Sequence, residues 1–381
     1  MLKQQHHRAT ISVAVDCRLM YYRKAGITNY TRRLVQAMAG YTSEFGITLS
    51  VILDRRDEDT YWMPNGVHVL RTFTPAHHQL EQFTLSGELA RFPIDVLHSP
   101  DFITCPGRFH KVITIHDLYF LEHPEVMSEE GRRYYGRVQK SAQMADHIIT
   151  PSHFTRENVL RLLRCVSPER VTVVYEAADA VGDTSSTVVL LERQPFILFV
   201  GTLEPRKNLV TLLRALKRLP EEVRLTVVGA EGWAGSSAEQ LAAALGVESR
   251  VRFAGQVCNA ELDALYRSAR LLTMPSLCEG FGLPVLEAMS RGTPVVCSNS
   301  GSLPEIVGDA ALMHAPLDDA TLASHILAFW NDDALHDEYA RRGQARAQQF
   351  SWTQAARETL QLYQAVCLGR EQMAAKAVAS L

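Results

Sequence analysis

The sequence predicts an α/β protein of two domains, each built around a doubly wound parallel sheet. Short apolar, β-branched runs alternate with amphipathic segments along most of the chain, a pattern typical of strands that are buried on both faces and joined by helices. At 381 residues the chain is too long for one ordinary hydrophobic core. Small and polar residues dominate AADAVGDTSSTVV at 177–189, so we expect a linker over 178–194.

The first predicted domain covers residues 1–178. Each of its strand-like runs is rich in Val and Ile, and helical apolar spacing follows most of them. We expect strands at 11–17, 47–54, 68–73, 94–99, 111–117, 147–152 and 170–176. The helices are expected at 27–40, 77–91, 128–145 and 153–164.

The second predicted domain covers residues 179–350 and repeats the alternation. We expect its strands at 196–201, 224–230, 251–255, 269–276, 294–298 and 311–316. Its helices are expected at 208–219, 236–246, 260–268, 284–291 and 318–330. A helical tail follows from about 334 to 377, interrupted near 350–352, and Ser351 is predicted to cap the last helix, in the segment 351–381.

The composition excludes several classes of protein. The chain has 46% hydrophobic and 21% charged residues and a net charge of −3, which gives no reason to expect nucleic-acid binding. Its seven cysteines contain no C-x-x-C pair, so reduced thiols are expected rather than a disulfide framework or a zinc ribbon. No signal peptide and no apolar stretch of roughly 20 residues is recognisable, so we expect a cytoplasmic protein.

Two glutamates, Glu279 and Glu287, flank the start of a predicted helix in CEGFGLPVLEAMSRGTPVVCS. The turn that begins at Glu279 contains two glycines and is too flexible for a helix interior, whereas Pro284 suits a first helical turn. A helix start attracts phosphate, but two acids would repel it. We therefore interpret the two carboxylates as ligands of sugar or ribose hydroxyls, which together with a phosphate-binding helix start indicates a nucleotide-sugar site.

The loop after the strand at 196–201 carries the cations that a diphosphate needs. It reads GTLEPRKN and leads into the predicted helix 208–219. Arg206 offers a forked set of donors and Lys207 a point charge, so together they could neutralise a diphosphate without a metal. A solvated basic turn is the alternative interpretation. The P-loop pattern G-x-x-x-x-G-K-[ST] is absent.

The first domain offers two further candidates after its strands. His116 stands at the end of the strand 111–117, from which a histidine can reach a cleft, although a satisfied structural histidine is the alternative. Gly26 precedes a helix and permits a close backbone approach to a ligand, although an ordinary loop glycine remains open. His98 is interpreted as structural. No G-x-G-x-x-G fingerprint occurs, which weakens an NAD interpretation.

Two charged clusters are open to more than one interpretation. The acidic triplet 57–59 could hold Mg²⁺, but two arginines stand beside it and we interpret it as a solvated loop, with no metal site. Basic residues on the helices predicted at 128–145 and 153–164 could meet anionic lipid head groups, with ordinary solvated helix faces as the alternative. That basic set comprises Arg132, Arg133, Arg137, Lys140, Arg156, Arg161 and Arg164.

These motifs resemble the retaining glycosyltransferases of family 4 along the whole chain. The most specific is E-x7-E, present as EGFGLPVLE and followed by GTPVV and GSLPEIVGDAAL. VGTLEPRKNL resembles the donor-phosphate loop of that family, while IHDLYFLEHPE and AGITNYTRRL resemble its bacterial mannosyltransferase-like branch. The resemblance implies the GT-B fold, in which an N-terminal acceptor-binding domain and a C-terminal nucleotide-sugar-binding domain, both Rossmann-like, face a cleft. FSWTQAA resembles the start of a final helix that crosses back onto the N-terminal domain.

The resemblance also implies roles for individual residues. Arg206 and Lys207 would bind the diphosphate and stabilise it as leaving group, and Glu287 would hold the ribose. Glu279 would lie near the transferred sugar, which His116 would face from the other domain. The other implied donor-site residues are Gly26, Thr202, Gly280, Phe281, Gly282 and Leu283. The chain departs from the family at VVGAEGW (227–233), where G-x-G is frequent, so this loop is expected to contact the donor differently.

The implied reaction moves a hexose from a nucleotide-diphospho-sugar to a hydroxyl of a growing, lipid-linked surface polysaccharide, with retention at the anomeric carbon. The same resemblance favours mannose from GDP-mannose and implies neither a metal nor another cofactor. It leaves open a peripheral contact with the inner membrane through the basic helices. A nucleotide-sugar epimerase or phosphorylase of the same fold and a non-catalytic sugar-nucleotide-binding subunit remain as alternatives.

Overall fold

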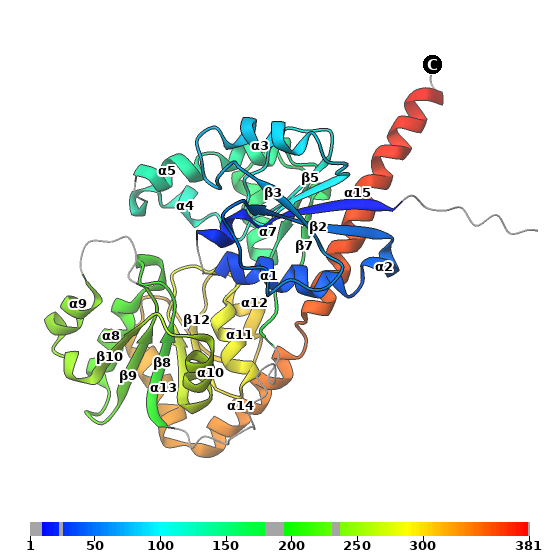
Figure 1. Ribbon diagram of the computed structural model, residues 1–381. Coiled ribbons are helices and arrows are strands. Elements are labelled where there is room, and N and C mark those ends of the chain that lie inside the picture. The colour runs from blue at the N-terminus through cyan, green and yellow to red at the C-terminus, as the bar shows by residue number, and fades with distance from the viewer. Residues whose placement is uncertain (1–9, 23–25, 128, 180–193, 231–236, 380–381) are drawn as a thin grey trace, which may run out of the picture.

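Two lobes, each with a parallel sheet covered by helices, make up the protein (Figure 1). The computed structural model describes residues 10–379 except 23–25, 128, 180–193 and 231–236. The N-terminal lobe contains a seven-stranded sheet and the C-terminal lobe a six-stranded one, as the sequence predicts for two doubly wound domains. The linker predicted at 178–194 lies mostly outside the described residues, as does the end of the loop 227–233.

The strands of the N-terminal lobe run in the order β3-β2-β1-β4-β5-β6-β7, and every adjacent pair is parallel. The strand order reverses between β1 and β4, the position where doubly wound sheets bind ligands. The strands are β1 (Ile11–Asp16), β2 (Ile47–Asp54), β3 (His68–Thr72), β4 (Val96–Ser99), β5 (His110–Thr114), β6 (His147–Thr150) and β7 (Val171–Val173).

The helices of the N-terminal lobe differ from the prediction in two places. The single helix predicted at 128–145 is two helices, and the break falls at Gly136, where glycine weakens a helix interior. The helix predicted from residue 77 begins at Glu81, because His77 has a left-handed backbone with φ of 68°. The helices are α1 (Gly26–Ala39), α2 (Thr42–Phe45), α3 (Glu81–Leu89), α4 (Tyr119–Glu122), α5 (Glu129–Tyr135), α6 (Val138–Met144) and α7 (His153–Leu162).

The C-terminal lobe repeats this plan with the strand order β10-β9-β8-β11-β12-β13, again all parallel. Its order reverses between β8 and β11. The strands are β8 (Gln194–Val200), β9 (Arg224–Val228), β10 (Val251–Gly255), β11 (Ala269–Met274), β12 (Val295–Ser298) and β13 (Leu312–His314). The helices are α8 (Leu209–Arg218), α9 (Ala238–Leu245), α10 (Asn259–Ser268), α11 (Leu283–Ser290), α12 (Leu303–Val307), α13 (Asp319–Asn331) and α14 (Asp333–Ala347).

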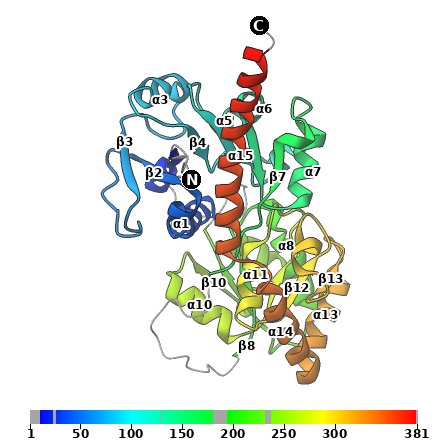
Figure 2. The same cartoon turned by 90° about the vertical axis from the view of Figure 1, so that its right-hand side faces the viewer.

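The last helix, α15 (Trp352–Ala379), leaves the C-terminal lobe and runs along the N-terminal one (Figure 2). Its first turn is capped by the Ser351 hydroxyl, which accepts the Gln354 N–H at 3.1 Å as the sequence predicts. Its apolar face, including Leu360 and Tyr363, is buried in the same core cluster as helix α1 and strands β1 and β2. The helix therefore belongs to the N-terminal core, although its sequence follows the C-terminal lobe.

A carboxylate of the C-terminal lobe caps a helix of the N-terminal lobe. Glu305 of α12 accepts the backbone N–H groups of His153 and Phe154 at 2.8 and 3.2 Å, at the start of α7. It also accepts the Tyr175 hydroxyl at 2.9 Å. Next to it, the Ser152 hydroxyl donates to the Gly280 carbonyl at 2.6 Å. The two backbone bonds to Glu305 satisfy N–H groups that a helix start leaves unpaired, and the hydroxyl bonds of Tyr175 and Ser152 add further links to the C-terminal lobe.

Candidate functional site

A cleft of about 1460 Å³ lies between the lobes, beside the carboxyl ends of several strands. We call it the interdomain cleft. The structure brings all the predicted site residues into its lining, so segments far apart in the sequence meet at one place. From the N-terminal lobe these are Gly26 and His116, and from the C-terminal lobe Thr202, Arg206, Lys207, Glu279, Gly280, Phe281, Gly282, Leu283 and Glu287.

Two cations converge on one buried carboxylate in this cleft. Arg206 and Lys207 lie in a 3-10 turn between β8 and α8. The Lys207 ammonium is 2.7 Å from Oε1 of Glu279, and the Arg206 guanidinium is 3.0 Å from its Oε2. The Ser276 hydroxyl donates to the same Oε1 at 2.6 Å. Glu279 is only 4% exposed, so the two cations pair with a buried carboxylate and do not form a solvated basic turn.

Glu279 is ionised in this setting. Burial favours the neutral acid and would raise its pKa, but the charges of Lys207 and Arg206 outweigh burial and lower the pKa to about 2. Burial alone would lower the pKa of Arg206, but the charges of Glu279, Asp117 and Glu204 together outweigh it and raise the pKa. Glu279 and Arg206 therefore stabilise one another in their charged forms.

The two cations keep N–H groups that can meet an anion. Arg206 also donates to the Cys278 carbonyl at 3.0 Å and to Glu204 at 2.7 Å, which uses its two terminal nitrogens. Among the described residues, its Nε–H has no hydrogen-bond partner, and the Lys207 ammonium has only Glu279 for its three protons. A diphosphate in the cleft would meet these unengaged donors already fixed in place.

Asn208 locks the loop that presents the cations, a role that sequence reasoning missed. Its backbone is left-handed, with φ of 53°. Its side-chain amide donates to the carbonyls of Pro275 at 2.9 Å and Pro316 at 2.6 Å, and its carbonyl oxygen accepts the Thr211 hydroxyl at 2.9 Å. Asparagine tolerates a left-handed backbone and is common just before a helix, so its position in the sequence could have indicated this role.

The turn before α11 requires glycine at two positions. A Cβ on Gly280 would lie 2.0 Å from the carbonyl oxygen of His116 in the other lobe, so a side chain there would push the lobes apart. Gly282 has φ of 101°, which L side chains rarely adopt. The Phe281 side chain is buried and packs against Tyr175 and Phe350. The two glycines therefore let the turn bring its backbone close to the other lobe.

Glu287 has a different setting from Glu279. It lies in the first turns of α11 and accepts a hydrogen bond from the Tyr266 hydroxyl at 2.7 Å. Burial raises the pKa of Glu287, and the Tyr266 hydrogen bond only partly offsets this. Tyr266 was not predicted, because only the packing of α10 on α11 brings it there. The two glutamates of the motif therefore differ in charge environment as well as in position.

His116 is held by hydrogen bonds at both ring nitrogens. Nδ1 lies 3.0 Å from the Glu176 carboxylate and Nε2 lies 2.9 Å from the Pro100 carbonyl oxygen. Both partners are acceptors, so the imidazolium satisfies both bonds. Burial lowers the pKa of His116, but the hydrogen bond and charge of Glu176 outweigh it and raise the pKa above its ordinary value. Glu176, which follows β7, is a second residue that sequence reasoning missed.

The remaining predicted positions have plain structural settings. His98 is fully buried and bonded to the Tyr363 hydroxyl at 2.6 Å and to Thr114 at 2.9 Å, so it is structural as expected. Residues 57–59 lie in a loop, as expected, but only Glu58 and Asp59 are exposed: Asp57 is buried, and its carboxylate accepts the Asp59 N–H at 3.1 Å. Within the described residues no three His, Cys, Asp or Glu side chains gather as a metal site, and no helix is long and apolar enough to cross a membrane.

Comparisons with known proteins agree with this geometry. The family model described as Glycosyltransferase Family 4 matches residues 25–181, and that of Glycosyl transferases group 1 matches residues 183–346. The O-antigen chain mannosyltransferase B of Escherichia coli is 37% identical over 281 residues, which cover 70% of this chain and 74% of the relative. An alpha-maltose-1-phosphate synthase of Mycobacterium tuberculosis is 28% identical over 321 residues, covering 77% and 79%.

Solved structures are similar over nearly the whole chain. A crystal structure of WaaG, a glycosyltransferase involved in lipopolysaccharide biosynthesis, matches with a TM-score of 0.71 and 19% identity over 93% of this chain and 99% of that one. Sucrose-phosphate synthase of Thermosynechococcus elongatus matches with a TM-score of 0.72 and 21% identity over 97% and 100%. The cleft, its cations and these matches together lead to one conclusion: the chain belongs to the group 1 and family 4 glycosyltransferases of the GT-B fold.

Proposed function

We propose that this glycosyltransferase moves a mannosyl group from GDP-mannose to a hydroxyl of a growing, lipid-linked surface polysaccharide, with retention at the anomeric carbon. The observation that carries the proposal is the convergence of Arg206 and Lys207 on Glu279 in the interdomain cleft. The names of the E. coli relative and of a Salmonella typhimurium relative, an O-antigen chain mannosyltransferase that is 27% identical, support mannose and a surface glycan.

The C-terminal lobe is proposed to bind the donor and the N-terminal lobe the acceptor. Negative charge builds on the diphosphate as the sugar departs, and Arg206 and Lys207 are fixed where they can stabilise it. Donors aimed in advance at a developing charge contribute about 3 kcal/mol each. Glu279 positions both cations, and Glu287 accepts a hydrogen bond from a ribose hydroxyl. Thr202 and the backbone of residues 280–283 complete the donor site.

The unengaged donors of the cation pair also support a metal-independent reaction. Two positive groups in a confined cleft supply the charge that a divalent ion would otherwise bring to a diphosphate. We expect activity to survive EDTA and to gain nothing from added Mg²⁺ or Mn²⁺. A strict requirement for either ion would contradict this part of the proposal.

His116 is proposed to face the transferred sugar from the N-terminal lobe, with Gly26 lining the cleft nearby. Because both of its ring nitrogens donate to fixed acceptors, His116 acts by position and charge and not as a general base. A base would need a free nitrogen lone pair, which this arrangement does not provide.

Binding of nucleoside diphosphates tests the donor directly. A ligand that binds only the folded protein raises its melting temperature by mass action. We expect GDP to stabilise the full chain more than UDP or ADP at equal concentration, and Lys207→Ala to abolish most of that shift. A preference for UDP would contradict GDP-mannose as donor, and no shift with any nucleotide would contradict the proposed site.

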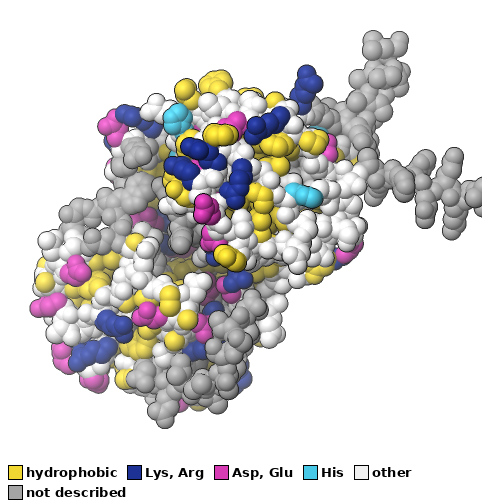
Figure 3. All heavy atoms as spheres, viewed as in Figure 1, with side chains coloured by type: hydrophobic (Ala, Val, Ile, Leu, Met, Phe, Trp, Pro, Cys, Tyr) yellow, Lys and Arg dark blue, Asp and Glu magenta, His cyan; other side chains and the backbone are white. Residues whose placement is uncertain are grey.

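We also propose a peripheral membrane contact. The surface we assign to it differs from the basic residues of the helices predicted at 128–145 and 153–164. Within that set, Arg133 pairs with Glu129 at 2.7 Å and Arg161 with Glu122 at 2.8 Å, so part of its charge is neutralised. Dark-blue and yellow side chains gather together on the N-terminal lobe (Figure 3). We give the name α3 patch to a group of five side chains in this lobe. It consists of the exposed Phe73, Leu80 and Phe83 and of two cations beside them, Arg55 over the Phe73 ring and Lys140 over the Phe83 ring.

Aromatic side chains beside cations suit the interface of an anionic bilayer. We expect the protein to sediment with vesicles that contain phosphatidylglycerol and not with neutral ones. Phe83→Ser should lower the bound fraction several-fold. Leu317→Ser, which removes an exposed leucine of the C-terminal lobe, is the matched control and should change nothing. Equal binding of Phe83→Ser and the control would remove the α3 patch from the proposal.

A further inference from the structure

The carboxylate of Glu287 has one oxygen held by the protein and one oxygen available to a ligand. Oε2 accepts the Tyr266 hydroxyl at 2.7 Å, and among the described residues Oε1 has no hydrogen-bond partner. No cation in the described part of the chain forms an ion pair with this carboxylate, whereas Glu279 has two. Of Tyr266 and Glu287, only Glu287 lines the interdomain cleft. Tyr266 can therefore affect a bound ligand only through Glu287.

Tyr266 is held in place behind the cleft, in the last turn of α10. Its side chain is 1% exposed, and the Arg291 guanidinium lies over its ring at 5.3 Å from the centroid. Arg291 in turn pairs with Asp263 of α10 at 2.7 Å. The Thr293 hydroxyl donates to the backbone carbonyl of Tyr266 at 2.5 Å. Contacts from α10 and from the end of α11 thus fix the direction in which the Tyr266 hydroxyl points.

The hydrogen bond between the two side chains runs from Tyr266 to Glu287. Burial and the charge of Glu287 raise the pKa of Tyr266 far above its ordinary value, so the phenol keeps its proton and donates. Burial also raises the pKa of Glu287, and the Tyr266 hydrogen bond is the largest interaction that opposes this. A hydrogen bond to the charged form favours that form. Because Tyr266 is neutral, it stabilises the carboxylate without cancelling its charge.

A charged carboxylate with an available oxygen favours neutral hydroxyl groups as ligands. Hydrogen bonds to an ionised acceptor are stronger than those to a neutral one, and a phosphate would be repelled. A buried acceptor also discriminates against analogues that lack the hydroxyl, because the acceptor would then stay unpaired. The degree of discrimination depends on how well the carboxylate is oriented and kept ionised, and the Tyr266 hydroxyl favours both.

We infer that Tyr266 is a positioning residue for nucleotide recognition, through which Glu287 selects ribonucleoside over deoxyribonucleoside diphosphates. The inference rests on the proposed function, in which Glu287 binds the ribose, and adds the residue that controls this contact. The alternative is a tyrosine that only fills the core. Loss of such a hydroxyl would weaken the binding of every nucleotide by the same factor, so the two roles have different consequences.

Calorimetric titration of the full chain with GDP and with its dideoxy analogue, which lacks both ribose hydroxyls, tests the role of Tyr266. The wild-type chain should bind GDP at least about tenfold more tightly than the analogue. Tyr266→Phe keeps the ring and removes only the hydroxyl. It should weaken GDP binding about fivefold and leave the affinity for the analogue within about twofold. Binding of the analogue also shows that the variant is folded.

Two further variants complete the test. Tyr339→Phe removes the hydroxyl of another tyrosine of the C-terminal lobe, which packs on Phe329, and it should keep both affinities. In Glu287→Gln the preference for GDP over the analogue should already be small, and adding Tyr266→Phe should not reduce it further. Equal weakening of GDP and analogue in Tyr266→Phe would overturn the inference. So would a preference that Tyr266→Phe reduces by the same factor with and without Glu287.

The outcomes also separate this inference from the proposed function. If UDP binds more tightly than GDP, GDP-mannose fails as the donor, and the same comparison with UDP and its dideoxy analogue decides the role of Tyr266. If the wild-type chain binds GDP and the dideoxy analogue equally, the inference fails. The proposed transfer would then still stand or fall with the loss of activity in Lys207→Ala.

Discussion

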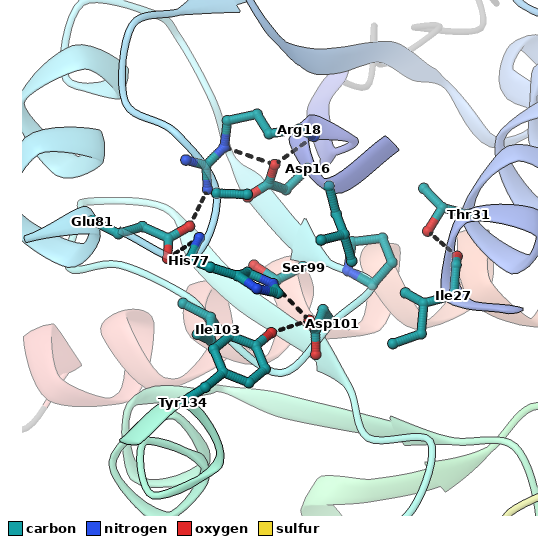
Figure 4. A pocket seen from close by; sticks show the side chains of 13 residues that line it. Asp16, Arg18, Ile27, Thr31, His77, Glu81, Ser99, Asp101, Ile103 and Tyr134 are labelled. Carbon is teal, nitrogen blue, oxygen red and sulfur yellow. Dashed lines mark hydrogen bonds and ion pairs between the residues drawn. The ribbon is translucent and has the colours of Figure 1, made fainter. Parts of the chain in front are cut away.

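Two arginines follow parallel strands, Arg206 in the interdomain cleft and Arg18 in the N-terminal lobe, but they differ in how many of their hydrogen-bond donors remain available. In the cleft, Arg206 and Lys207 share Glu279 and keep N–H groups available. In contrast, Arg18 is buried at the end of β1 (Figure 4), and all three of its side-chain nitrogens donate to Asp16, Glu81 or the Thr74 carbonyl. Each arginine pairs with two carboxylates, so the number of acceptors that surround it, and not its position after a strand, decides whether N–H groups remain for an anion.

The largest effect should come from removing a cleft cation. Lys207→Ala takes away a charge that we propose to face the diphosphate. We expect kcat/KM to fall about 100-fold or more, the loss that follows from about 3 kcal/mol. The folded structure should survive, because Glu279 retains Arg206 and Ser276. Steady-state kinetics with GDP-mannose measure this. Lys217→Ala, at an exposed lysine at the end of α8, is the matched control and should keep wild-type turnover.

Unchanged turnover in Lys207→Ala would break the comparison, because the cleft cations would then be structural in the same way as Arg18.

An intermediate effect should come from neutralising the carboxylate that the cations share. Glu279→Gln removes the negative charge beside Lys207 and Arg206, so we expect GDP to bind a few-fold more tightly. We expect kcat to fall at least tenfold, because the two cations lose the carboxylate that fixes their positions. The free energy of unfolding should drop by about 1–3 kcal/mol. Calorimetric titration with GDP, kinetics and denaturant unfolding measure the three quantities.

The pH dependence of that stability has a defined sign. The pKa of Glu279 is lowered to about 2 in the fold, so its contribution is fully present above the ordinary carboxyl pKa of about 4.3 and is lost as pH falls through about 2. The stability gap between wild type and Glu279→Gln should thus be constant above pH 5 and shrink below it. Glu239→Gln, at an exposed position of α9, should show no gap. A gap that widens on acidification would contradict the ion cluster.

The smallest effect concerns His116, which lines the interdomain cleft from the N-terminal lobe. Its pKa is raised, so the stability contributed by its charged form is fully present below the ordinary histidine pKa of about 6.5 and is lost as pH rises through the raised value. Glu176→Gln removes the main interaction that opposes burial, so the pKa of His116 should fall. An NMR titration of the ring, assigned with His116→Asn, measures it. An unmoved pKa would show that Glu176 does not control the charge of His116.

Much of the fold could be predicted because strand patterns are local. The apolar β-branched runs led to the thirteen described strands of the two sheets. Errors arose where a single residue overrides helical spacing, as at Gly136 and at the left-handed His77. The short helix α12 was also missed, since five residues carry little periodicity, and yet it supplies Glu305 to the contact between the lobes.

The sequence predicted which residues gather at the candidate site, but not the hydrogen bonds and ion pairs between them. Residues that follow strands converge at one edge of a sheet, so Glu279, Arg206 and Lys207 could be placed together. Their contacts with Ser276 and Glu204 depend on which loops meet in three dimensions, and no sequence spacing encodes that.

The path of α15 has a consequence for engineering. Because the core of the N-terminal lobe is completed by the last helix of the chain, the C-terminal lobe is an insertion within the N-terminal one, bounded by residues near 178 and 350. Exchange of donor specificity between relatives therefore requires two crossover points and not one. A chimera with a single crossover after β7 would carry the α15 of the other relative. That helix would pack less well against α1, so the N-terminal lobe would lose stability although its own sequence is unchanged.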